Sequence, residues 1–247
     1  MMLEQTLSTL HQFKLFGMAR GLTNRLTNPA HAKLAHEEFF GLIVQDEKID
    51  RDNRRLSRLL RGAQLRQNAS LENVDYNHPR SLPAQLFQEL ANPRWITQGS
   101  HVLLTGPTGI GKSWLACALG NFAARQGFTV LYLRAPRLFE MLLQSKADGS
   151  HLKFLAKIAR AQLLIIDDFL LTPLTDAERS DMLEIIEDRH QTTATVLTSQ
   201  LPTKHWHAAI GEPTLADALC DRLFHQAFKI ELRGDSVRKI TGGESPS

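Results

Sequence analysis

The 247-residue sequence has few of the features that mark secreted and membrane proteins. Its only two cysteines, Cys117 and Cys220, fall among apolar neighbours in predicted helices. This favours two buried thiols over a disulfide or a metal site. The longest apolar block, at 163–166, is far shorter than the roughly 18 residues that span a bilayer. Because Glu4 comes early and no unbroken apolar stretch follows it, we expect no secretory signal, a cytoplasmic location and no membrane partner.

Excess charge is also scarce, at +3 for the whole chain, but it is unevenly distributed. Residues 48–66 contain seven basic residues against Asp50 and Asp52, which leaves that segment with a net charge of +5. A helix would place five arginines along one side of this segment, and they are Arg51, Arg54, Arg55, Arg58 and Arg61. Like charges at such spacings repel, so the face is either solvated or met by an anionic partner.

The order of the segments predicts an α/β protein with a small helical domain in front. Apolar residues recur at helical spacing from Leu3 to Phe13, and no proline interrupts residues 37–66. Turn-forming residues are frequent over 67–100 and predict a linker with short helical pieces. We therefore expect a helical N-terminal region over 1–66, this linker, and a domain of ATPase size over 101–247.

Strand and helix patterns alternate from His101 onward, and this alternation is typical of a parallel sheet covered on both faces. We expect a five-stranded parallel sheet lying between helices. The strands are predicted at about 101–105, 129–134, 162–167, 194–198 and 228–232.

A glycine-rich motif, GPTGIGKS, follows the first predicted strand and precedes a predicted helix. It matches the P-loop pattern in the required context. Its backbone N–H groups can surround phosphates, Lys112 can reach the β- and γ-phosphates, and the Ser113 hydroxyl can ligate Mg²⁺. The predicted nucleotide-binding residues are Gly106, Pro107, Thr108, Gly109, Ile110, Gly111, Lys112, Ser113 and Trp114, the last at the start of the following helix.

Two adjacent acids, Asp167 and Asp168, end the third predicted strand. Burying two carboxylates at a strand end is costly without a cation, and Mg²⁺ is the natural one. Asp167 is therefore the predicted metal ligand. Asp168 is the candidate to orient the attacking water, although it could also simply cap a turn.

Polar residues also end the fourth predicted strand, which would lie beside the acids if the two strands pair. Either Thr198 or Ser199 could contact the γ-phosphate or the water, and we include Ser199 in the predicted catalytic set. Physical reasoning does not choose between the two, and an ordinary strand end stays possible.

Five motifs in this sequence resemble one known family. They are GPTGIGKS at 106–113, LLIIDDF at 163–169, TSQ at 198–200, DALCDRLFH at 217–225 and RGDSVR at 233–238. With the early helices and the arginine-rich stretch 51–66, they resemble the IstB-type transposition helper ATPases of insertion sequences. These belong to the initiator and helicase-loader clade of AAA+ ATPases. The resemblance covers nearly the whole chain and implies an AAA+ core that binds ATP with Mg²⁺.

The resemblance also assigns roles to two arginines near the C-terminus. Arg222 matches the arginine finger that completes a neighbouring subunit's site, which implies a homo-oligomer; from the residues alone, a surface ion pair with Asp217 or Asp221 is the alternative. Arg238 matches a second sensor of the nucleotide. Only nine residues follow it, so we expect a truncated lid in place of a full helical one, which puts this role in doubt.

For this clade, the anionic partner expected at the basic helix is double-stranded DNA, bound largely without regard to sequence because no base-reading motif is present. The implied function is ATP-dependent assembly on target DNA and stimulation of the partner transposase. A DnaC-like loader that acts on a replicative helicase and single-stranded DNA is the alternative. A nucleotide-gated DNA-binding module without hydrolysis is a third, and sequence chemistry does not separate ATP from GTP.

Overall fold

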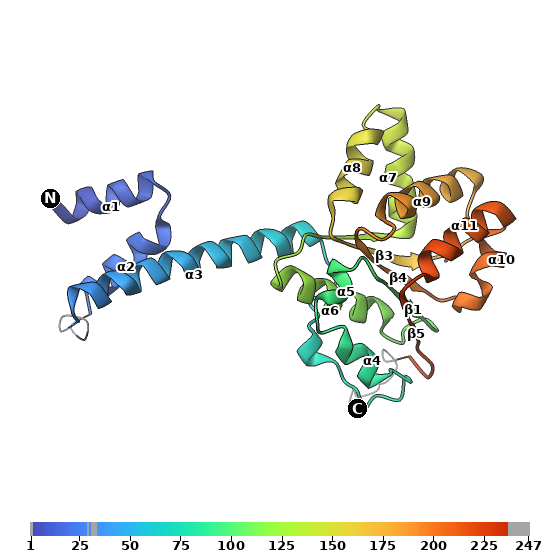
Figure 1. The fold of residues 1–247 in the computed structure, drawn as a ribbon, viewed down its shortest axis with the longest axis horizontal. Helices are drawn as coiled ribbons and strands as arrows, with labels where there is room; N and C mark the ends of the chain where they lie inside the picture. The colour runs from blue at the N-terminus through green and yellow to red at the C-terminus, as the bar shows by residue number, and fades with distance from the viewer. Residues whose placement is uncertain (1, 29, 31–33, 237–247) are drawn as a thin grey trace, which may run out of the picture. The chain divides into compact units, whose positions relative to one another are not determined.

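The computed structural model describes residues 2–28, 30 and 34–236 (Figure 1). It contains two compact units, which we call the N-terminal unit, residues 1–58, and the C-terminal unit, residues 59–247.

Three helices form the N-terminal unit, as the sequence predicts. They are α1 (Met2–Gln12), α2 (Phe16–Leu26) and the first part of α3 (His36–Ala63). Close packing of α2 on α3 depends on glycine: a Cβ on Gly17 would lie 2.6 Å from the backbone oxygen of Asp46. Small residues therefore let the two helix backbones approach each other.

The side of α3 that faces α2 is acidic, and its carboxylates bind polar groups of α2. Glu47 is buried and accepts hydrogen bonds from the backbone N–H groups of Gly17 (2.8 Å) and Met18 (3.1 Å). These N–H groups have no partner within their own helix, so Glu47 caps α2 from outside. Arg25 pairs with Asp46 in the same interface.

A five-stranded parallel sheet is the centre of the C-terminal unit, in agreement with the prediction. Its strands are β1 (His101–Thr105), β2 (Val130–Arg134), β3 (Leu163–Phe169), β4 (Ala194–Ser199) and β5 (Ala227–Glu231). Their order in the sheet is β2-β3-β4-β1-β5, and every neighbouring pair is parallel. The carboxyl ends of β1, β3 and β4 therefore meet at one edge, where ligands bind in open parallel sheets.

Each face of this sheet carries its own hydrophobic cluster. On one face, strand residues such as Val102 and Ile165 pack with α6 (Lys112–Arg125). On the other, residues such as Leu103 and Ile166 pack with α7 (Ala135–Ala147), α8 (His151–Arg160), α9 (Asp176–Arg189), α10 (Trp206–Ile210) and α11 (Pro213–Phe224). A short 3-10 turn, η3 (Thr203–His205), precedes α10. Two-sided burial explains why the strands are continuous apolar runs.

Residues 67–100, expected as a linker, are part of the C-terminal unit and line its first cluster. They form η2 (Leu71–Asn73), α4 (Ala84–Glu89) and α5 (Arg94–Thr97), and they bury Phe87, Leu90 and Trp95. The compact units divide at Arg58, inside α3, because Leu59, Leu60 and Ala63 already pack on that cluster. The predicted end of the helical N-terminal region is residue 66, because turn-forming residues become frequent after it. Among the described residues, no helix has the length and apolar character needed to cross a membrane.

Candidate functional site

The P-loop connects β1 to α6, as its motif predicts. Lys112 is the first residue of α6 and is buried; its Nζ donates to the backbone oxygens of Gly106 (2.7 Å) and Pro107 (2.9 Å). Burial lowers the pKa of Lys112, and the nearby carboxylates of Asp168 and Asp167 oppose that shift. The lysine is thus held inside the loop, where it can meet phosphate oxygens.

Two glycines of the loop have close neighbours that leave no room for a side chain. A Cβ on Gly109 would lie 2.1 Å from Ser236 Oγ, and one on Gly111 would lie 2.8 Å from Arg80 Nη1. Both residues also have positive φ, +83° and +100°, a region that glycine enters without steric cost. The loop is therefore enclosed by the segment after β5 and by the segment before α4.

Asp167 is fully buried at the end of β3, and three hydroxyl groups hold its carboxylate. Ser113 Oγ donates to Oδ1 over 2.8 Å, and Thr198 Oγ1 donates to the same oxygen over 2.5 Å. Tyr132 donates to Oδ2 over 2.6 Å. The pair predicted to hold Mg²⁺, Ser113 and Asp167, is thus in direct contact. The pair offers two oxygen ligands next to a phosphate-binding loop, and Mg²⁺ prefers oxygen ligands.

Tyr132, from β2, was not foreseen in this role. Burial raises the pKa of its phenol, and the hydrogen bond to Asp167 raises it further, so the hydroxyl stays protonated and donates. Its ring lies on the face of the first hydrophobic cluster. The tyrosine therefore holds Oδ2 of Asp167, whereas Ser113 contacts Oδ1.

Asp168 lies within a register irregularity of β3, between Ile166 and Phe169, and has φ of +61°. This places it outside the regular strand alternation, and its carboxylate accepts two hydrogen bonds from Arg134, from Nε at 3.0 Å and from Nη2 at 2.8 Å. Its backbone N–H donates to Thr198 Oγ1 over 3.0 Å. The carboxylate raises the pKa of Arg134. Strained backbone of this kind is common at functional sites.

A cavity of about 560 Å³ opens at this edge of the sheet. The P-loop contributes Thr108, Gly109, Gly111, Lys112, Ser113 and Trp114, while Gly106, Pro107 and Ile110 of the predicted set do not line it. Asp168, Arg134 and Gln200 line the side of the strand ends. The remaining lining residues are Leu171 and five residues that precede α4, Arg66, Gln67, Asn73, Asp75 and Arg80.

The structure distinguishes the two residues considered at the end of β4. Thr198 contacts both acids, through Asp167 Oδ1 and the N–H of Asp168. Ser199 instead accepts from the backbone N–H of Leu201 over 3.1 Å, and its own carbonyl accepts from Gly106 N over 3.2 Å. Thr198 therefore has the position expected of the sensing hydroxyl, whereas Ser199 supports the turn and the start of the P-loop.

Arg222, on α11, is not among the residues that line the cavity of its own chain. Its Nη2 donates to Glu187 over 2.5 Å and its Nη1 to the backbone oxygen of Ala218 over 3.0 Å. An ion pair is therefore present, with Glu187 as the partner in place of Asp217 or Asp221. Arg238 lies outside the described residues.

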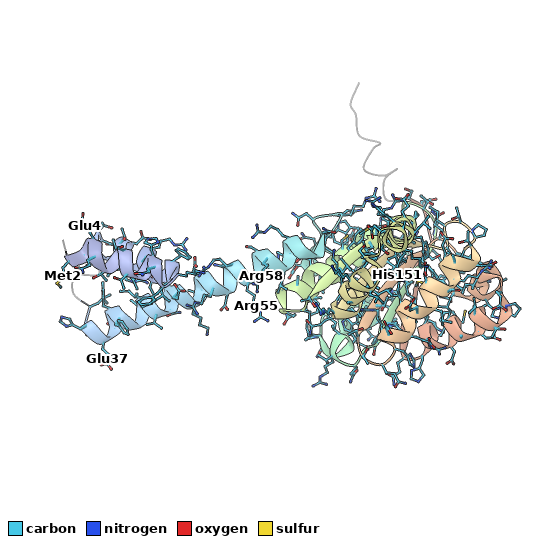
Figure 2. The ribbon with its side chains drawn as sticks, turned by 90° about the horizontal axis from the view of Figure 1, so that it is seen from above. Met2, Glu4, Glu37, Arg55, Arg58 and His151 are labelled. Carbon is cyan, nitrogen blue, oxygen red and sulfur yellow. The ribbon has the colours of Figure 1, made fainter. Side chains whose placement is uncertain are left out.

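The five arginines of the basic face all lie on α3, and Arg51 and Arg54 are among those that contact other groups of the protein. Arg51 pairs with Glu47 over 2.7 Å, and Arg54 pairs with Asp50 over 2.7 Å while its guanidinium lies 5.1 Å from the centre of the Phe16 ring. The count of basic and acidic residues over 48–66 does not include Glu47, which lies just before that segment. In Figure 2, Arg55 and Arg58 lie on α3 beyond the stretch that α1 and α2 cover.

Sequence reasoning gave no role to several residues that line the cavity, one of which, Gln200, ends the TSQ motif. Arg134 ends a strand next to β3, so the rule that parallel strands end at one edge could have found it. Gln200 follows Thr198 and Ser199 directly. For Asp75 and Arg80, no local pattern signals that the chain folds back onto the P-loop.

Comparison with known proteins agrees with this geometry. The family model of IstB-like ATP binding proteins matches residues 8–245. The chain belongs to this family. It is 43% identical to the insertion sequence ATP-binding protein y4pL of Sinorhizobium fredii, over 97% of this chain and 98% of the relative. It is 47% identical to an ATP-binding protein of insertion sequence IS1162 from Pseudomonas fluorescens, over 86% and 93%.

Solved structures that resemble this chain confirm the AAA+ P-loop fold. The structure of DnaI matches at 22% identity and a TM-score of 0.59, over 71% of this chain and 93% of that one. The replication initiator DnaA bound to AMPPCP and single-stranded DNA matches at 18% identity and a TM-score of 0.58, over 70% and 52%. The fold and the association with insertion sequences are thus as the sequence predicts.

Proposed function

We propose that this protein is a Mg²⁺-dependent ATPase that assembles on double-stranded DNA in its ATP state and stimulates the transposase encoded by the same insertion sequence. The observation that carries the proposal is the chain of hydrogen bonds from Ser113 through Asp167 to Thr198, at a cavity that Lys112 and Asp168 also line. Membership of a family named for insertion sequences supports the biological setting.

In this proposal the chain's own residues position the reactants. Lys112 neutralises the β- and γ-phosphate oxygens, and Ser113 and Asp167 hold Mg²⁺, which when bound offsets the phosphate charge. Asp168 orients the attacking water and accepts its proton. Thr198 contacts both acids and so responds to their position.

Arg222 completes the site of a neighbouring subunit. Since it lies outside the cavity of its own chain, its guanidinium can reach a γ-phosphate only in another copy. ATP then favours assembly because its γ-phosphate bridges two subunits, and hydrolysis removes that bridge.

The catalytic part is tested by Asp168→Asn, which keeps the size of the side chain and removes its basicity. We expect turnover to fall by at least about a hundredfold while ATP binding stays within a factor of about three. Steady-state phosphate release and equilibrium titration with ATP measure the two quantities. Unchanged turnover would refute the role of Asp168 and favour a nucleotide-gated module without hydrolysis.

The assembly part is tested by electron microscopy of the protein with a non-hydrolysable ATP analogue and either duplex or single-stranded DNA. We expect ordered oligomers on the duplex only. A clear preference for single strands, together with binding to a replicative helicase and not to the transposase, would support the loader alternative, which the likeness in fold to the DnaC helicase loader allows.

A further inference from the structure

A buried arginine outside the motifs reaches the P-loop. Arg80 is 5% exposed and lines the cavity, although it belongs to the segment that precedes α4. Its Nη1 lies 2.8 Å from the position that a Cβ of Gly111 would occupy. The guanidinium is therefore packed directly against the loop that surrounds the phosphates.

The protein gives this guanidinium few partners. Its Nη2 donates to the backbone oxygen of Asp75 over 2.9 Å, and its Nε is buried without a hydrogen-bond partner. Among the described residues, no carboxylate lies within ion-pair distance of it. Burial lowers the pKa of Arg80, and the charges of Asp75 and Tyr76 offset only part of that shift. A buried cation without an anion is costly, and arginine does not escape the cost by losing its proton at neutral pH.

The backbone around Arg80 holds the side chain in this place. Its carbonyl accepts from the N–H of Arg233 over 3.0 Å, and its N–H donates to the His78 carbonyl over 2.7 Å. Pro79 lies so close to Gly234 that a Cβ there would be 2.3 Å from the Pro79 oxygen. The segment is thus fixed next to the chain that follows β5.

The lining of the cavity carries an excess of positive charge. Its lining contains four cationic side chains, Arg66, Arg80, Lys112 and Arg134, against two carboxylates, Asp75 and Asp168. Arg134 is already paired with Asp168. Excess positive charge therefore remains on the side where Arg80 and Lys112 face the loop.

We propose that Arg80 is a nucleotide-binding residue that donates its guanidinium N–H groups to the α- and β-phosphates. The assignment to these two phosphates follows from Gly111, which belongs to the part of the loop whose backbone N–H groups surround them. The inference rests on the ATP-binding function proposed above and adds a contact that ATP and ADP share. It differs from the role of Arg222, which depends on the γ-phosphate.

The experiment compares Arg80→Gln and Arg80→Lys with wild type by calorimetric titration with ATP and with ADP. We expect Arg80→Gln to weaken both nucleotides by the same factor, about 10- to 100-fold, the range for losing charge-assisted hydrogen bonds. Arg80→Lys keeps the charge without the planar fork and should recover part of the loss. Arg233→Ala is the matched control, because that side chain is 73% exposed and pairs with Glu231.

Thermal unfolding without nucleotide separates a ligand contact from a structural one. Because the guanidinium has no carboxylate partner, Arg80→Gln should unfold at the same or a higher temperature than wild type. The proposal is overturned if ADP affinity is unchanged, or if both variants lose affinity together with a lower unfolding temperature. If wild type itself binds neither nucleotide, the proposed ATP-binding function is refuted, and the proposed contact of Arg80 is refuted with it.

Discussion

Single hydroxyl groups hold the acid that is predicted to bind the metal. Asp167 has three of them, from Ser113, Thr198 and Tyr132, and only Ser113 is a predicted metal ligand itself. Partners of a ligand affect metal affinity because they fix the orientation of its lone pairs. The tyrosine offers a clean test, since removing its hydroxyl leaves the ring packing unchanged.

Tyr132→Phe should raise the Mg²⁺ concentration needed for half-maximal turnover by about tenfold. Nucleotide binding without Mg²⁺ should stay the same, because the hydroxyl contacts Asp167 and not the loop. The measurements are turnover against Mg²⁺ and ADP titration in the presence of a chelator. Tyr76→Phe, at the only other tyrosine, is the control; an unaltered Mg²⁺ requirement in Tyr132→Phe would show that this hydroxyl has no influence on the metal site.

The residue scale also shows what a sequence can and cannot reveal. Lys112, Ser113 and Asp167 were predicted because each belongs to a contiguous motif whose spacing reflects one local structure. Thr198 stayed one of two candidates, because adjacent strand residues point to opposite faces and only the register of β3 with β4 decides which one meets the acids. Arg80 was missed because its proximity to Gly111 depends on the fold of thirty intervening residues.

At the scale of elements, the pairing of α2 with α3 depends on one carboxylate. Burial raises the pKa of Glu47, but hydrogen bonds from Arg51, Met18 and Gly17 outweigh this and leave it below the ordinary value of 4.5. A lowered pKa in the folded state means that the carboxylate stabilises the fold above the unfolded pKa. That contribution disappears as pH falls through the folded pKa.

Glu47→Gln should therefore lower the free energy of unfolding of the N-terminal unit at pH 7 by about 1 kcal/mol, the usual value of a helix cap. The difference from wild type should shrink as pH falls from about 4.5 through the lowered pKa of the folded state, because the wild-type carboxylate then becomes protonated. Urea unfolding of the full chain, followed by far-UV circular dichroism, measures it. Asp52→Asn, an exposed change on the same helix, is the control; a difference that persists unchanged at low pH would argue against this carboxylate.

The basic face of α3 is the second feature at this scale that can be tested. Arg55 and Arg58 are both exposed on this face, and we choose them for testing phosphate contacts. Replacing both by alanine should reduce the slope of log K against log salt for duplex binding by about 2, one unit for each lost contact. Fluorescence anisotropy over a salt series gives the slope.

A control for that experiment removes two exposed cations of the C-terminal unit, in the double variant Arg94→Ala and Lys204→Ala. It changes the net charge by the same amount. Equal slopes for the two double variants would mean that overall charge, and not the face of α3, attracts the DNA.

At the scale of the whole molecule, the prediction of an arginine finger depends on a contact between two subunits. Arg222 has a partner in its own chain, Glu187, and that ion pair must open before a neighbouring phosphate is reached. Since the side chain of Glu187 is 51% exposed, the pair is a weak competitor for a triphosphate.

Arg222→Ala should lose turnover and keep near-normal ATP binding. Mixing it with Lys112→Ala should restore part of the activity, because one variant contributes an intact nucleotide site and the other an intact arginine. Phosphate release at a range of mixing ratios is the measurement, and Glu187→Gln, which should retain turnover, is the control for the ion pair. No recovery at any ratio would count against action between subunits.

The close contact between Gly109 and Ser236 affects how P-loop variants should be interpreted. The general pattern allows any residue at this position, so a motif search would treat a substitution there as neutral. In this chain a methyl group would collide with the segment after β5 even if every phosphate contact were kept. Defects caused by Gly109→Ala would therefore reflect the packing of the segment after β5 against the P-loop. A comparison of the motif alone would overlook that constraint.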